Sequence, residues 1–110
     1  MSIEDRLADL GIDLPPVAKP VAAYVPAIQV GDQISTSGQL PLISGSLPMT
    51  GLVGDQISQG DAAGQARVAA LNALAAAADV AGGVNNIRRV VRVVVYVAST
   101  ADFTAQPAVA

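Results

Sequence analysis

The sequence predicts a small α+β domain, because strand, helix and strand patterns follow one another along its 110 residues. The first observation is a pair of strand-like segments over residues 24–40, joined by Gly31-Asp32. The second is an alanine-rich helical segment over roughly residues 61–81, and the third is a valine-rich segment over residues 87–98. This order favours a sheet that packs on helices.

Composition excludes several kinds of active site. The chain has no His, no Cys and no Trp, and although 52% of its residues are hydrophobic only 3% are aromatic. A Ser-His-Asp triad, a Cys nucleophile and a thiolate or imidazole zinc site all need residues that are absent. We expect an aliphatic core of Ala, Val, Leu and Ile.

Charge and hydropathy bear on partners and location. The net charge of −3 argues against a protein that binds a phosphate backbone. Arg88, Arg89 and Arg92 alternate between the two faces of the expected strand, which suits solvated strand ends or salt bridges between subunits. The chain has no apolar run of about 18 residues and no secretory signal. We therefore expect a cytoplasmic protein that binds neither nucleic acid nor a membrane.

Residues 2–10 are expected to form a short helix, followed by a linker. Ser2 and Asp5 have the spacing of a capping box, and Ile3, Leu7 and Leu10 fall at helical spacing. The stretch from residue 14 to 20 is flanked by prolines and is interpreted as a linker. It contains Lys19, the one residue of the chain that could form a Schiff base, and a linker position gives it no catalytic role.

The hairpin over residues 24–40 carries the candidate binding site. Gly first in a two-residue turn suits type II′, which pairs Val30 with Gln33 and, continued outward, Tyr24 with Gln39. Ser37 then lies diagonally on the same face. A phenol, a hydroxyl, an amide and a glycine backbone would converge at four residues, namely Tyr24, Ser37, Gly38 and Gln39. The alternative is an ordinary hairpin with polar residues on its exposed face.

The long helix should begin near Ser58 or Gly60 and end at Gly82-Gly83. Its apolar stripe is formed by Val68, Leu71, Leu74 and Ala78. Polar residues recur every seven positions on another side of the helix (Gln65, Asn72 and Asp79). Residues 42–54 are interpreted as turns around short, irregular strands.

The segment from Ile87 to Ala98 is expected to be a strand covered on both faces, because its apolar run is almost unbroken. The helix can cover one face. A partner subunit is the simplest cover for the other.

These features resemble the Rid family (YjgF/YER057c/UK114) over nearly the whole chain. The most specific motif is Ser37-Gly38-Gln39-Leu40-Pro41. Further matches are the hairpin from Tyr24 to Gly31, the Thr50-Gly51 turn, Gly54-Asp55 before a helix with Asn72, and Asp102-Phe103. Residues 2–16 are similar to a branch of the family that begins with a short acidic helix.

The resemblance implies a chorismate-mutase-like (bacillus-type) α+β fold, with a mixed sheet packed on helices and a homotrimer whose sheets form a central barrel. It also implies hydrolysis of reactive enamines and imines, such as 2-aminoacrylate, to 2-oxo acids and ammonia between subunits, without a metal or an organic cofactor. Tyr24 matches the pocket tyrosine of the family, and Ser37 and Gly38 match the pocket wall. Pro107 falls near the position of a pocket asparagine. The endoribonuclease (L-PSP-like) activity attached to family names is disfavoured by the absence of His and by the charge.

Family members continue beyond the position of Ala110 with a second helix and last strands. Those elements carry an arginine that binds the substrate carboxylate and a glutamate near the attacking water. We therefore expect residues 1–110 to form a single Rid-like domain that lacks these elements, with its catalytic residues unidentified. Deaminase activity requires that the missing part supply both residues. The alternative is a non-catalytic small-molecule-binding or interaction module on the same trimeric fold.

Overall fold

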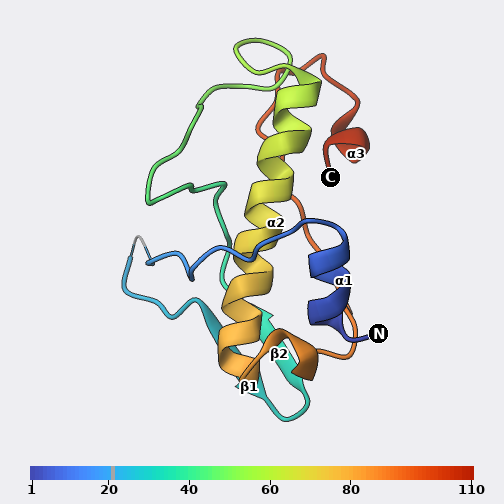
Figure 1. The fold of residues 1–110 in the computed structure, drawn as a ribbon. Coiled ribbons are helices and arrows are strands. Elements are labelled where there is room, and N and C mark those ends of the chain that lie inside the picture. Colours follow the sequence, from blue (N-terminus) through green and yellow to red (C-terminus); the bar gives the residue numbers. More distant parts are fainter. Residues whose placement is uncertain (21) are drawn as a thin grey trace.

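The computed structural model describes residues 1–20 and 22–110 and is organised around one long helix (Figure 1). The elements in chain order are α1 (Ile3–Asp9), β1 (Ala27–Val30), β2 (Gln33–Thr36), α2 (Gln59–Ala81), the 3₁₀ helix η1 (Val84–Asn86) and α3 (Gln106–Val109). The β1–β2 hairpin packs on α2 near its C-terminal end, and α3 lies near its N-terminal end (Figure 1). None of the helices in these described ranges is both long and apolar enough to cross a membrane.

The hairpin has the predicted register. Val30 pairs with Gln33 and Ala27 pairs with Thr36 in an antiparallel ladder. Gly31 has a φ of +59°, and Ser44 is the one non-glycine with positive φ in the described residues, so the Gly31-Asp32 turn fits type II′ and not type I′. The strands are shorter than predicted. Beyond them the Ser37 N–H still donates to the Pro26 carbonyl at 2.8 Å, while Pro26 itself has no N–H to continue the ladder.

Helix α1 begins with the predicted capping box. The Asp5 N–H donates to Ser2 Oγ at 3.0 Å, and the Ser2 N–H donates to Asp5 Oδ2 at 3.3 Å. The helix lies against η1, where the Glu4 N–H donates to Asn85 Oδ1 at 2.9 Å and Asn85 Nδ2 donates to Glu4 Oε2 at 3.2 Å. These contacts join the N-terminal helix to the segment that follows α2.

Helix α2 begins and ends close to the predicted residues. Ser58 is its N-cap and accepts a hydrogen bond from the Asp61 N–H at 3.1 Å. Gly82 ends the helix with a φ of +80°, a conformation that glycine adopts without steric cost.

The buried face of α2 is only partly the predicted one. Val68, Leu71 and Leu74 are half-buried, whereas four alanines are buried (Ala62, Ala75, Ala76 and Ala78). Asn72, which was expected to lie off the apolar stripe, is 2% exposed. Small side chains let neighbouring segments approach the helix closely, so alanine and the amide of Asn72, rather than leucine, lie deepest.

The hydrophobic cluster lies near the N-terminal end of α2 and consists of Val53, Ile57, Ala62 and Val109. Backbone hydrogen bonds hold Val53 in place, because its N–H donates to the Ala98 carbonyl at 2.9 Å and its carbonyl accepts from Thr100 at 3.0 Å. The next residue, Gly54, has a φ of +97°, and a Cβ there would lie 2.7 Å from Thr100 Oγ1. This tight turn therefore requires glycine.

The predicted strand from Ile87 to Ala98 is wrong for this chain. The segment passes alongside α2 without a ladder to β1 or β2, and the one bridge near it joins Val53 to Ser99 (Figure 1). Most of its valines are exposed rather than covered, with Val90 at 69%, Val91 at 71% and Val93 at 71%, whereas Val97 is half-buried and packs against the hydrophobic cluster. A strand is defined by hydrogen bonds to a neighbour, and the two-stranded sheet of the described residues provides none here.

Candidate functional site

A small cavity beside the hairpin brings together three of the four predicted site residues. Tyr24, Gly38 and Gln39 line it. The remaining lining residues come from the linker and from the segment after Gln39 (Ala18, Lys19, Pro20, Leu40 and Leu42). The volume is about 10 Å³, which is about the space that one water molecule needs.

Ser37, the fourth predicted residue, does not line the cavity but contacts a residue that does. Gln39 Nε2 donates to Ser37 Oγ at 3.1 Å. The hydroxyl acts as acceptor in this bond, so its own proton is available for a second partner. Ser37 is half-buried and Gly38 is exposed, and apart from its chain neighbours no atom of the described residues lies within 4 Å of the Cβ that a side chain at Gly38 would have. The backbone at Gly38 is therefore accessible to a ligand.

The cavity wall continues into a turn that is bound to α2. The Leu42 N–H donates to the Leu40 carbonyl at 2.8 Å, which closes a three-residue turn on Pro41. Asn72 Nδ2 donates to both carbonyls of this turn, at 2.9 Å to Leu40 and at 3.1 Å to Leu42. Sequence reasoning did not identify Asn72 as a site residue. The sequence placed it only among the polar residues that recur every seven positions of the helix and among the residues that resemble the family.

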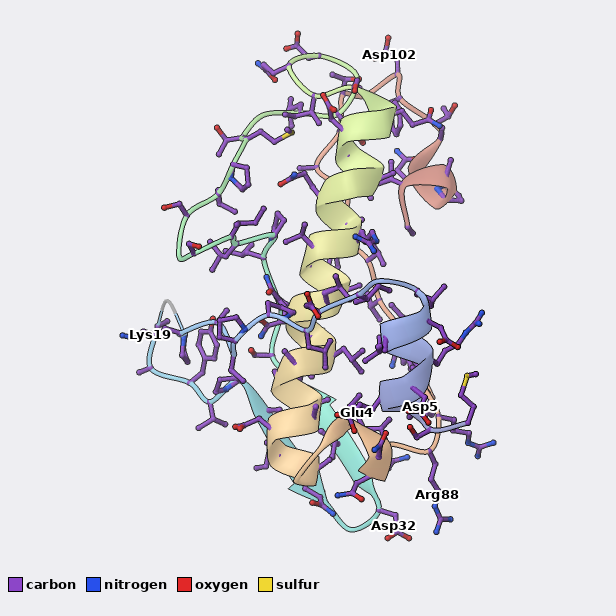
Figure 2. All side chains as sticks on the ribbon, in the orientation of Figure 1. Glu4, Asp5, Lys19, Asp32, Arg88 and Asp102 are labelled. Atoms are coloured by element: carbon purple, nitrogen blue, oxygen red, sulfur yellow. The ribbon has the colours of Figure 1, made fainter. Side chains whose placement is uncertain are left out.

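Lys19 is a second residue that was not expected at the site. Sequence reasoning assigned it to a linker, yet it is the only charged residue among the described residues that line the cavity. The residue is exposed, and its side chain extends away from α2 at the outer edge of the loop (Figure 2). Arg88 lies on the other side of α2, so this arginine is not part of the cavity (Figure 2).

A larger and more open groove of about 500 Å³ lies between the linker and the C-terminal half of α2. Its walls are mostly apolar, and its one ionisable side chain is Asp79. In the described ranges, no group of three or more His, Cys, Asp or Glu side chains could hold a metal ion. The polar chemistry gathers instead at the cavity of Tyr24, Gly38 and Gln39.

Comparison with known proteins gives one family and one fold. Residues 4–106 match the family described as "YjgF/chorismate_mutase-like, putative endoribonuclease". Protein TCP17 of Trypanosoma cruzi is 36% identical over 105 residues, which are 96% of this chain and 66% of that protein.

Two crystal structures have the same fold. A "putative endoribonuclease" from Shewanella oneidensis is 34% identical, with a TM-score of 0.71 over 76% of this chain and 56% of that one. A protein of unknown function from Agrobacterium tumefaciens is 36% identical, with a TM-score of 0.77 over 98% of this chain and 66% of that one. These matches confirm the predicted α+β, chorismate-mutase-like fold. The chain spans less than two thirds of the length of each of these relatives.

Proposed function

Because the chain belongs to the YjgF/chorismate-mutase-like family, as the Ser37–Pro41 motif predicted, we propose that the protein hydrolyses reactive enamines and imines. The observation that carries the proposal is the cavity where Tyr24, Gly38 and Gln39 meet. In the proposed reaction, water adds to the imine carbon of a 2-imino acid and the C–N bond then breaks. The products are a 2-oxo acid, whose new carbonyl oxygen comes from water, and ammonia.

The residues of the cavity have complementary capacities for such a ligand. Gly38 offers an accessible backbone, and the Ser37 hydroxyl, oriented by Gln39, can donate to a carbonyl or carboxylate oxygen. The Tyr24 phenol can donate or accept. These groups bind and orient a small polar molecule, and no metal or organic cofactor enters the proposed step.

The cavity is too small to enclose the substrate by itself. A space of about 10 Å³ holds one water, whereas 2-aminoacrylate has several non-hydrogen atoms. We propose that a second subunit of a homotrimer forms the opposite wall, and that the exposed valines from Val90 to Val95 contribute to this assembly. The groups that receive the carboxylate and activate water are proposed to belong to the part of the longer relatives that the chain does not match.

The test is hydrolysis of 2-aminoacrylate, generated in the assay by a dehydratase. The full-length gene product should release pyruvate faster than buffer alone. Tyr24→Phe should slow the release, and Ser35→Ala, on the hairpin ladder opposite Ile28, should leave it unchanged. A rate no faster than that in buffer would overturn the enzymatic proposal.

A second candidate is a non-catalytic ligand-binding module on the same fold. Pro107, in α3, stands near the position where the family resemblance expects a pocket asparagine, and it has no side-chain donor. Titration with 2-oxo acids should then raise the melting temperature without any turnover, because a ligand of the native state stabilises it. Since the family description names endoribonucleases, an RNA cleavage assay belongs beside both experiments.

We also propose a cytoplasmic location, in keeping with the absence of cysteine from the chain. Fractionation of cells that express a tagged full-length protein checks this assignment.

A further inference from the structure

We propose that Asn72 positions the wall of the binding cavity, acting as a clamp that holds the Leu40-Pro41-Leu42 turn against α2. This proposal rests on the proposed function in one respect, namely that the cavity binds a 2-oxo or 2-imino acid. The two hydrogen bonds by which Asn72 holds the turn do not depend on which ligand the cavity binds.

The first observation is the burial of an amide. Asn72 is 2% exposed and is the one buried polar residue in the described part of the chain. An amide that leaves water without hydrogen-bond partners destabilises the fold, so a buried Asn on an alanine-rich face needs specific acceptors. Apolar side chains would fill this position without that requirement.

The second observation is what the amide binds. Its two N–H groups meet two carbonyls that are two residues apart, Leu40 at 2.9 Å and Leu42 at 3.1 Å. These acceptors lie 32 and 30 positions away in sequence. A pair of hydrogen bonds from one rigid amide fixes both the position and the orientation of the turn relative to the helix.

The third observation is that, in the part of the chain that the structure describes, no other strand pairing or helix supports the wall. The β1–β2 ladder ends at Thr36, and the last hairpin bond is the one between the Ser37 N–H and Pro26. Gly38 and Gln39 lie between that bond and the turn that Asn72 holds. Leu40 and Leu42 line the cavity together with them. Asn72 therefore acts on the ligand-facing residues through the wall and is a positioning residue.

The central experiment compares Asn72→Asp with Ala76→Gly. Asn72→Asp has the same shape, but when ionised it has no donor and turns a negative charge toward two carbonyls. Ala76→Gly lies on the same helix at a residue that is 1% exposed, and it weakens the helix without removing either hydrogen bond. It is the matched control for a general loss of stability.

The first measurement needs no ligand. In Asn72→Asp, amide hydrogen exchange at Ser37 and Leu42, whose N–H groups donate to the carbonyls of Pro26 and Leu40, should accelerate about tenfold or more relative to Ala76→Gly, once both rates are corrected for global stability. In a Tyr96→Phe background, Tyr24 is the one tyrosine left, and its fluorescence emission should change in Asn72→Asp but not in Ala76→Gly. Equal corrected exchange rates in the two variants would overturn the proposal that Asn72 holds the turn.

The second measurement uses pyruvate as the probe ligand. Its affinity, or the KM of the deaminase assay, should worsen about tenfold in Asn72→Asp and stay near wild type in Ala76→Gly. If the wild-type protein binds no 2-oxo acid, the proposed function fails. The exchange data still test whether Asn72 holds the Leu40-Pro41-Leu42 turn. If Asn72→Asp does not fold, Asn72→Ser, which keeps one donor, takes its place with the same criteria.

Discussion

At the scale of single residues, the hydroxyl of Ser37 is the sharpest test of the cavity. Gln39 Nε2 donates to it at 3.1 Å, so the hydroxyl is held in place and has a proton to offer a ligand. Ser37→Ala removes both contributions, and we expect pyruvate to bind about fivefold more weakly, the usual effect of one lost hydrogen bond. Calorimetric titration measures the affinity. Ser35→Ala, a serine of the same hairpin opposite Ile28, is the control and should bind as wild type.

The residues of the cavity differ in how far the sequence could predict them. Tyr24, Gly38 and Gln39 could be placed near one another because a two-residue turn fixes the register of the hairpin, although the ladder itself ends at Ala27 and Thr36 and the three residues lie beyond it. Asn72 and Lys19 could not, because their places depend on how distant segments pack. The contact of Asn72 with Leu40 spans 32 positions, and no local pattern encodes it.

At the scale of elements, the N-cap of α2 should be worth more to the fold than the N-cap of α1. Ser58 accepts from the Asp61 N–H at 3.1 Å at the start of the helix on which β1, β2, η1 and α3 pack. Ser58→Ala should lower the free energy of unfolding by about 1 kcal/mol, as the loss of such a cap usually does. Urea denaturation followed by circular dichroism measures this change.

Ser2→Ala is the comparison, since Ser2 caps a short helix with no buried residues. In Ser2→Ala we expect the ends of α1 to fray while the urea unfolding transition of the whole protein stays almost unchanged. An equal loss of stability in both variants would show that α1 unfolds together with α2, contrary to this expectation.

Local signals explain why α1 and α2 were predicted well and the last strand was not. Ser2, Ser58 and Gly82 act on backbone groups of their own helix, so the helix bounds follow from the sequence around them. The segment from Ile87 to Ala98 has the residues of a strand, but a strand also needs a neighbour. In the described residues the sheet stops at β1 and β2, and the valines from Val90 to Val95 are left exposed.

At the scale of the whole molecule, that exposed run predicts how the protein assembles. Monomeric proteins rarely expose a long contiguous apolar patch, and Val90, Val91 and Val93 are each about 70% exposed. In the proposed trimer these side chains become buried. Val93→Glu should then raise the dissociation constant of the full-length protein about a hundredfold or more, because burying an unpaired carboxylate is costly.

Light scattering on a size-exclusion column, run over a range of protein concentrations, measures the assembly. Val30→Glu is a matched control, because Val30 is also 71% exposed but stands beside the Gly31-Asp32 turn at the tip of the hairpin. The Val93 variant should elute as a smaller species with unchanged helical content, and the Val30 variant as wild type. Loss of assembly should also lower pyruvate affinity, since the cavity of about 10 Å³ would lose its opposite wall. A Val93→Glu protein that assembles as wild type does would remove the valine run from the proposed interface.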